Sequence, residues 1–171
     1  METTNAKLYS LTFSELRTYL YAMLFVIGNV ALPQLCHLIP NGGPMLLPIF
    51  FFTLIAAYKF GFVAGLLTAV LSPLVNFLMF GMPDATMLPF VLLKSVLLAV
   101  AAAYAAHRFG KVSLPLLIAV VLFYQLLGTA VQCLVLGNIA SVLPMLYTAV
   151  PGMLIQVLLG YVIIRYWDGL R

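Results

Sequence analysis

Acidic residues are almost absent from this chain, and none lies inside one of its long apolar runs. Only four Asp and Glu occur among 171 residues, and charged residues of both signs make up 7% of the sequence. A soluble domain has roughly 25% charged residues. The chain is instead 65% hydrophobic, with a mean hydropathy of +1.18. A composition this apolar requires lipid as its solvent, so we expect one integral membrane domain over residues 1–171.

Several catalytic signatures are also missing from the sequence. There is no GxxxxGK[ST] phosphate loop, no HExxH and no cluster of Cys and His. His37 and His107 fall on opposite sides of the predicted membrane, so they cannot share a metal. The two cysteines, Cys36 and Cys133, are interpreted as small apolar packing residues. We therefore expect no enzymatic activity, no resident cofactor and no metal site.

The apolar runs predict an all-α protein with six membrane helices. A helix needs about 20 residues to cross the hydrocarbon. The predicted spans are residues 18–36, 45–58, 60–79, 87–106, 114–136 and 142–166. The second is short, but Lys59 has to return to the side of the other basic residues. No convincing cleavage site surrounds the first run, so we expect a span there rather than a signal peptide.

Basic residues lie almost entirely on one side of this pattern. They are Lys7, Arg17, Lys59, Arg108, Lys111, Arg165 and Arg171, whereas the alternate breaks at 37–44, 80–86 and 137–141 carry none. Cytoplasmic loops are enriched in Lys and Arg, so both termini are predicted to be cytoplasmic. The dispersal of these residues at helix ends favours contact with membrane lipid and argues against nucleic-acid binding.

The eighth basic residue, Lys94, lies within the fourth apolar run. A cation in lipid is costly enough to be a functional hypothesis by default. At about 1.5 Å per residue from Met87, Lys94 lies roughly 10 Å below the outer surface. Two interpretations stay open. The side chain either snorkels to that surface or faces a solvated cavity, where it binds an anionic ligand.

Other polar residues share the predicted membrane level of Lys94. They are Asn29, Gln34, Asn76, Gln132, Asn138 and Thr148, with Asn41 and Asp84 in adjacent loops and Tyr147 as a ring for stacking. Taken singly, each amide or hydroxyl is explained by a bond between helices, and Tyr147 by interfacial anchoring. Their shared level favours a cavity that opens outward. Gln125 and Gln156 lie deeper and are interpreted as contacts between helices.

Small residues recur every four positions at the start of the third run. Gly61, Gly65 and Ala69 would form a smooth ridge on one helix face. Such ridges let helix backbones approach closely within a membrane. We therefore expect this face to contact another helix.

Four sequence features of residues 20–108 together point to a known family. They are the Gly/Pro-rich first loop, the LPI opening of a short second helix, the paired glycines of GFVAGLL, and the run SPLVNFLMFGMP. All lie in HLIPNGGPMLLPIFFFTLIAAYKFGFVAGLLTAVLSPLVNFLMFGMPDATMLPFVLLKS. This stretch resembles the substrate-binding S components of energy-coupling factor (ECF) transporters. The resemblance implies a small six-helix protein that binds a vitamin or related micronutrient in an outward-facing pocket.

The resemblance also implies partners and site residues. An S component docks on a membrane coupling subunit that carries two cytoplasmic ATPases, forming an ECF-type ABC importer of the bacterial or archaeal inner membrane. The implied pocket comprises Asn41, Asp84, Lys94, Gln132, Asn138 and Thr148, and Lys94 favours an anionic ligand. Many S components meet the coupling subunit through two alanines spaced four apart, and here those positions hold Ala22 and Val26. We expect Gly61, Gly65 and Ala69 to take part in this docking.

One alternative belongs to a different class of protein. MreD-like structural subunits of cell-wall elongation complexes have a similar length and number of helices. Such a scaffold needs no ligand cavity around Lys94, so a cavity that reaches this residue from outside would separate the two interpretations.

Overall fold

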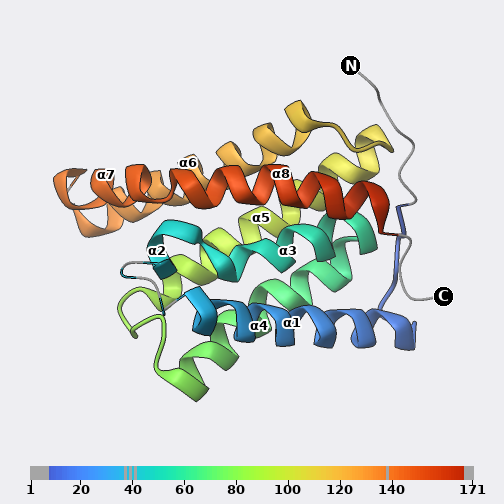
Figure 1. Ribbon diagram of the computed structural model, residues 1–171, viewed down its shortest axis with the longest axis horizontal. Helices are drawn as coiled ribbons and strands as arrows, with labels where there is room; N and C mark the ends of the chain where they lie inside the picture. The colour runs from blue at the N-terminus through green and yellow to red at the C-terminus, as the bar shows by residue number, and fades with distance from the viewer. Residues whose placement is uncertain (1–7, 37, 39, 41, 138, 168–171) are drawn as a thin grey trace.

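The computed structural model describes residues 8–36, 38, 40, 42–137 and 139–167. Within them the chain forms eight α-helices (Figure 1): α1 (Leu16–Cys36), α2 (Gly42–Leu46), α3 (Pro48–Phe60), α4 (Phe62–Phe80), α5 (Leu88–Phe109), α6 (Leu114–Leu136), α7 (Ile139–Thr148) and α8 (Val150–Tyr166). Five segments are long and apolar enough to cross a membrane, and α7 with α8 makes a sixth if that bent pair is one span. The protein is therefore a helical, multi-pass membrane protein with five or six spans.

Two of the predicted spans are interrupted in the structure. Leu47 separates α2 from α3 and adopts the left-handed region, with φ 50° and ψ 44°. Pro48 follows it, and a proline disfavours the right-handed helical conformation in the residue before it. The second segment thus runs over Gly42–Phe60, which at 19 residues is longer than the predicted 45–58. The last segment bends by 41° between Thr148 and Val150.

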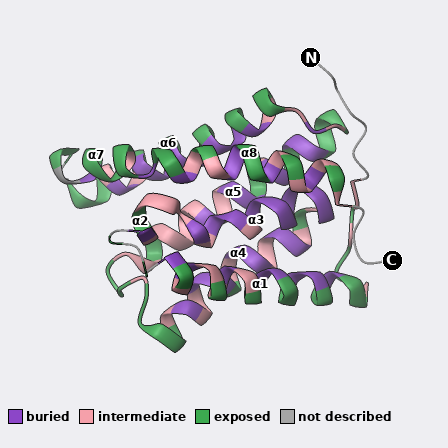
Figure 2. Cartoon of the chain, in the orientation of Figure 1, coloured by how far each residue is buried: buried purple, intermediate pink, exposed green. Residues whose placement is uncertain are grey.

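Helix α3 forms the centre of the bundle. It contacts α1, α4, α5 and α8, and eleven of its 13 residues are buried (Figure 2). A helix that is apolar on every side is stable when other elements surround it. Ala56 and Ala57 are both fully buried. Their small side chains let the neighbouring helices approach α3 closely.

The closest of these approaches is between α3 and α4. A Cβ atom on Gly65 would lie 2.4 Å from the Cβ of Ala57 and 2.5 Å from its Cα. Lipid supplies no hydrophobic drive between helices, so close contact of this kind holds them together. Gly65 and Ala69 of the predicted ridge are both buried inside the chain. Gly61 ends α3, with φ 97°.

Both ends of the described chain meet at the same end of the bundle (Figure 1). The backbone N–H of Tyr9 donates to the carbonyl of Lys59 at 2.7 Å, and that of Leu11 donates to Phe60 at 3.2 Å. These bonds satisfy carbonyls that the last turn of α3 leaves open. The ring of Tyr9 stacks on Phe60 at 5.5 Å, and Trp167 packs against the same ring at 5.4 Å. We call this arrangement the terminal clasp.

Lys59 has a different environment from the one its place between two spans suggested. Its side chain is 1% exposed, and its Nζ donates to the carbonyl of Ile164 at 2.8 Å. That carbonyl belongs to the final turns of α8, where open carbonyls and the helix dipole both favour a cation. Lys59 therefore fastens the end of α8 to the end of α3.

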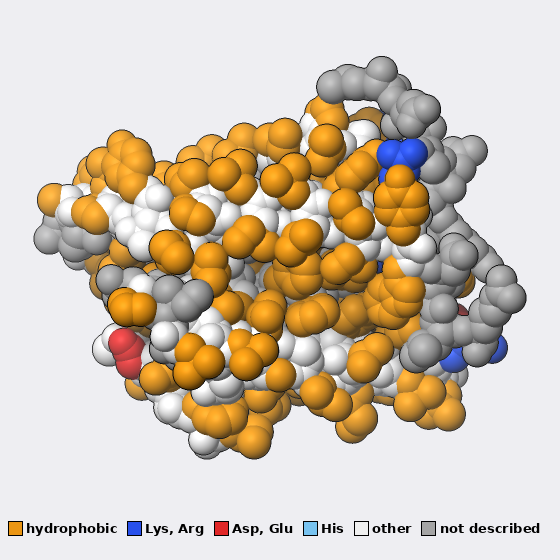
Figure 3. All heavy atoms as spheres, in the orientation of Figure 1, with side chains coloured by type: hydrophobic (Ala, Val, Ile, Leu, Met, Phe, Trp, Pro, Cys, Tyr) orange, Lys and Arg blue, Asp and Glu red, His pale blue; other side chains and the backbone are white. Residues whose placement is uncertain are grey.

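Most of the remaining cations lie at one end of the molecule, together with Glu15. Arg17, Arg108 and Arg165 lie at the end that holds the terminal clasp, because they occupy the start of α1 and the ends of α5 and α8. Asp84 lies in the loop at the opposite end. Figure 3 shows apolar side chains covering the face between the basic and the acidic ends. The position of the termini on the cytoplasmic side stays a prediction.

Selective labelling tests that orientation. Cys36 and Cys133 are first replaced by alanine, and then Ala85→Cys or Phe109→Cys is introduced at exposed positions at opposite ends of the bundle. A membrane-impermeant thiol reagent added to intact cells should label the Ala85→Cys protein and leave the Phe109→Cys protein unlabelled until the cells are opened. The reverse pattern would place the termini outside.

Gly65→Ala should destabilise the bundle, because its new Cβ meets the backbone and Cβ of Ala57. Overpacking of this kind costs about 1–3 kcal/mol, measured as a lower thermal midpoint in detergent. Gly160→Ala is the matched control, since its Cβ would meet only the tip of Leu54, at 3.2 Å. A gain in helix propensity offsets that contact. Equal thermal midpoints for the two variants would show that Gly65 is not needed for the packing of α3 against α4.

Candidate functional site

A cavity of about 390 Å³ lies at the end of the bundle opposite the terminal clasp. Its volume falls within the range of small-molecule sites, which is roughly 300–1,000 Å³. Its walls come from the end of α1, α2, the starts of α3 and α5, the end of α4, the loop between α4 and α5, the second half of α6, and α7. Apolar side chains such as Ile49, Phe50, Phe90 and Val91 form most of the wall, and a few polar groups interrupt it.

Lys94 lines this cavity from the first half of α5. Its aliphatic stem crosses the surface of α6 at Gly128, where a Cβ would lie 2.4 Å from Cγ of Lys94 and 3.1 Å from Cε. The stem thus points towards α6, inside the bundle. Lys94 is thus one of the residues that line the cavity, and its binding of an anionic ligand stays a prediction. The absence of a side chain at Gly128 makes this path available.

Asp84 lines the same cavity from the loop between α4 and α5. Its backbone carbonyl accepts bonds from the N–H groups of Met87 and Leu88, at 3.0 and 2.9 Å, and so begins α5. Asp84 and Lys94 line one cavity without forming a salt bridge. Among the residues that the structure describes, no carboxylate lies within 4.0 Å of the Lys94 amine. The Lys94 amine therefore lines the cavity unpaired, with Asp84 as a carboxylate on the same wall beyond ion-pair distance.

Gln132 connects two walls of the cavity. It is 2% exposed, and its Nε2 donates to the sulfur atoms of Met87 at 3.7 Å and Met145 at 3.8 Å. Sulfur is a weak acceptor, so these contacts leave the amide available to a stronger partner. The loop before α5 and helix α7 thus both touch one amide side chain of α6.

A buried layer of hydrogen bonds centred on Asn29 lies beside the cavity. The Nδ2 of Asn29 donates to Thr53 Oγ1 and to Ser72 Oγ, each at 3.1 Å, while its Oδ1 accepts from the backbone N–H of Phe52 at 3.2 Å. Asn76 donates through Nδ2 to the carbonyls of Asn29 and Ser72, at 2.9 and 3.0 Å. This layer joins α1, α3 and α4, and it places Asn76 on the cavity wall.

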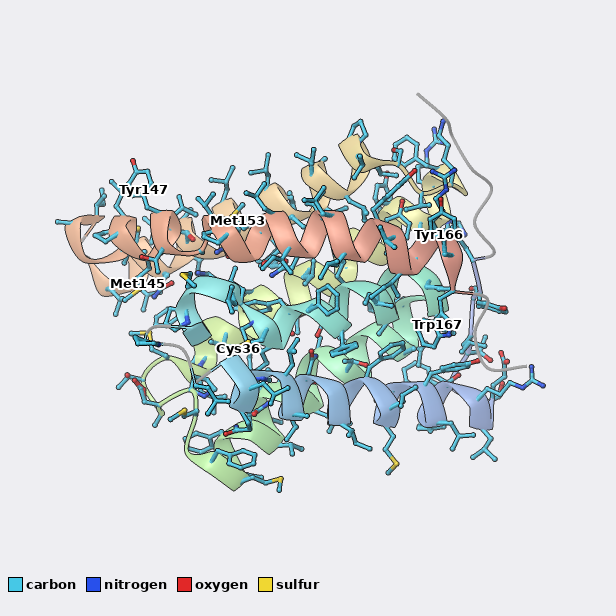
Figure 4. The ribbon with its side chains drawn as sticks, in the orientation of Figure 1. Cys36, Met145, Tyr147, Met153, Tyr166 and Trp167 are labelled. Atoms are coloured by element: carbon cyan, nitrogen blue, oxygen red, sulfur yellow. The ribbon has the colours of Figure 1, made fainter. Side chains whose placement is uncertain are left out.

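The remaining predicted site residues are not part of this wall. Tyr147 is 69% exposed and points away from the bundle in Figure 4, whereas Met145 of the same helix lines the cavity. The hydroxyl of Thr148 is exposed and donates to the carbonyl of Pro144 at 2.9 Å, so its own helix satisfies it. Asn41 and Asn138 lie outside the described residues.

The predicted docking residues are mostly covered by the chain itself. Ala22 is 3% exposed and Val26 is 9% exposed, and both face the core of the bundle. Exposed side chains of α1 lie next to them, with Met23 at 65% and Ile27 at 62%. In this conformation a partner that approached α1 would therefore meet Met23 and Ile27 first.

Two residues of α6 near Gln132 carried no site prediction. Gln125 was interpreted as a contact between helices, yet it lines the cavity, and Gly128 holds the path of Lys94. With Gln132 they follow the spacing i, i+3, i+7, which places all three on one face of α6. That spacing is the signal by which the sequence alone could have grouped them.

The described residues contain no group of three or more His, Cys, Asp or Glu that could hold a metal ion. The cavity presents one cation, Lys94, one carboxylate, Asp84, several amides and apolar walls. No protein-family model, curated protein or solved structure matches the chain. The resemblance to ECF S components thus rests only on the sequence features of residues 20–108.

Asn29→Leu should destabilise the bundle, because it removes the side chain that joins three helices and leaves Thr53 and Ser72 with fewer partners. Lost interhelical bonds of this kind cost about 1–3 kcal/mol together. Unfolding in a denaturing detergent would measure this loss. Thr148→Val removes one exposed bond within a single helix and should shift stability by less than about 0.5 kcal/mol. Equal stability of the two variants would contradict the joining role of Asn29.

Proposed function

We propose that the protein is the substrate-binding S component of an ECF-type importer, which captures an anionic, vitamin-like micronutrient from outside the cell. The observation that carries this proposal is the cavity at one end of the bundle, which Lys94 lines without forming a salt bridge. Burying a cation in lipid is costly, and a bound anion offsets this cost. An anionic ligand would complete the ion pair.

The shape of the cavity supports a small organic ligand over an inorganic ion. Phe50, Phe90 and Val91 line the same cavity as Lys94 and give it apolar surface. Small-molecule sites combine such surface with a few polar groups that fix orientation. An inorganic anion would use Lys94 and leave most of this wall without contacts.

The proposed partners are a membrane coupling subunit and two cytoplasmic ATPases, which supply the energy that a chain without a phosphate loop lacks. Ligand release to the cytoplasm would then follow docking. The exposed face of α1 with Met23 and Ile27 is the part of that helix open to such a subunit. The proposed location is the inner membrane of a bacterial or archaeal cell.

A structural role of the MreD-like type has less support. A scaffold subunit gains nothing from an unpaired cation beside a cavity of about 390 Å³. Its helices would be expected to close around apolar side chains, because unpaired polar groups weaken a membrane bundle.

Lys94→Met should abolish most ligand binding while the helix survives, because Met is apolar and favours helices. Truncating one partner of a desolvated charge pair weakens binding by at least about thirtyfold. Native mass spectrometry of gently purified protein identifies the co-purified compound, and calorimetry on it gives the ratio of affinities. Gly128→Ala is the companion variant. It keeps the charge but blocks the path of the lysine stem, so it should also weaken binding.

Unchanged affinity in Lys94→Met would remove the lysine from the site. If Lys94→Met weakens binding and Gly128→Ala does not, the charge matters but its path over α6 does not.

A further inference from the structure

Gln125 is a buried amide for which the described part of the chain provides no partner. It is 2% exposed, and its Oε1 is enclosed without a hydrogen bond. It lies on the cavity wall, on the same helix as Gly128 and Gln132. An amide left unpaired in an apolar interior is costly, so its retention calls for a specific explanation.

Gln156 shows how this fold treats a glutamine that does connect helices. It is fully buried, its Oε1 accepts from the hydroxyl of Tyr124 at 2.9 Å, and its Nε2 donates towards the carbonyl of Leu47 at 3.5 Å. Gln156 does not line the cavity, whereas Gln125 does. The two glutamines thus differ in their partners: Gln156 bonds to protein groups, whereas Gln125 lines the cavity and its enclosed Oε1 has no partner among the described residues.

Asn76 adds a second open acceptor to the same cavity wall. Both hydrogen bonds of its Nδ2 go to backbone carbonyls, those of Asn29 and Ser72. Carbonyls accept and do not donate, so the orientation of the amide is fixed and its Oδ1 is the remaining atom. This oxygen is buried and has no partner among the described residues.

We infer that the ligand of this cavity carries, beside its negative group, an amide or hydroxyl whose N–H or O–H donates to the oxygens of Gln125 and Asn76. This inference rests on the proposed function, because it deepens the ligand class of the same site. Lys94 would bind the negative group of the ligand. The two amide oxygens would accept hydrogen bonds from its amide or hydroxyl. The apolar wall around Phe90 and Val91 would cover what lies between them.

The inference excludes ligands that an anion site alone would accept. A fatty acid or an unsubstituted aromatic carboxylate satisfies Lys94 but leaves Gln125 and Asn76 unpaired. A site built to hydrogen-bond a substrate N–H or O–H rejects analogues that lack it, because its own buried groups then stay unsatisfied. The class expected is therefore that of hydroxylated or amide-bearing small carboxylates.

Retention of small molecules from a defined mixture tests this inference. Purified wild type, Lys94→Met and Gln125→Met are each incubated with a protein-free filtrate of yeast extract, washed and denatured. The masses of the released compounds are measured by mass spectrometry in H₂O and in D₂O. The difference between the two masses gives the number of exchangeable hydrogens. We expect a compound that wild type retains, that Lys94→Met loses, and that Gln125→Met binds about tenfold less. It should show an exchangeable hydrogen besides that of its acid group, and octanoate should not displace it.

Stability measurements separate binding from a structural role. Gln125→Met removes an unsatisfied group and keeps the shape, so its thermal midpoint without ligand should stay equal or rise. Gln156→Met is the matched control: it breaks existing bonds, so its midpoint should fall while retention persists. If Gln125→Met fails to fold, Gln125→Glu takes its place, because a carboxylate of the same length would compete with the anion for Lys94 and abolish retention.

The outcomes distinguish a failure of this inference from a failure of the proposed function. Equal retention by Gln125→Met, or a retained compound whose acid hydrogen is its only exchangeable one, overturns the inference and leaves the proposed function standing. If wild type retains nothing, or Lys94→Met retains as much as wild type, the proposed function falls and the inference falls with it.

Discussion

Polar groups inside this bundle depend on one another, because lipid offers them no hydrogen bonds. Asn29 joins α1 to α3 and α4, Lys59 joins α3 to α8, and Gln156 accepts from Tyr124 and so joins α6 to α8. Each of these bonds ties together helices that apolar contact alone would hold only loosely, since lipid tails are as apolar as the side chains. The central position of α3 follows from the same requirement, because two of the three sets of bonds include it.

The cavity is one place where this rule is relaxed. Asn76, Lys94 and Gln125 line the cavity from three different helices. The Oδ1 of Asn76 and the Oε1 of Gln125 are enclosed without a partner, and no carboxylate lies within ion-pair distance of Lys94 among the described residues. Gln34 Nε2 and Ser95 Oγ are also buried without a partner among the described residues, but neither residue lines the cavity. A molecule bound in the cavity would complete the groups of the residues that line it. Departures from local consistency are expected mainly at functional sites, so their occurrence at the cavity supports the proposed binding site.

The outline of the fold could be predicted from the sequence because its signals lie along the chain. Apolar runs, the spacing of Gly61, Gly65 and Ala69, and the rarity of an intramembrane lysine need no knowledge of neighbours. The finer features depend on what lies across the bundle. Lys59 was assigned to a break between spans because its partner, Ile164, lies 105 residues further along the chain.

Gln125 and Gln156 could not be told apart for the same reason. The two are the same residue type at a similar depth, and only the groups opposite them distinguish a contact between helices from a cavity wall. Thr148 fails in the other direction: a serine or threonine in a helix can bond to the carbonyl four residues before it, so a polar residue at the right membrane level need not face a site.

The terminal clasp has a consequence for the order in which the protein is completed during synthesis. Phe60 receives Tyr9 from the start of the chain and Trp167 from near its end. The contact with Tyr9 can form as soon as α3 has been made, since domains fold from the N-terminal side as they emerge. The contact with Trp167 must wait until α8 has been made. The side of Phe60 that Trp167 covers is therefore closed only after that helix is complete.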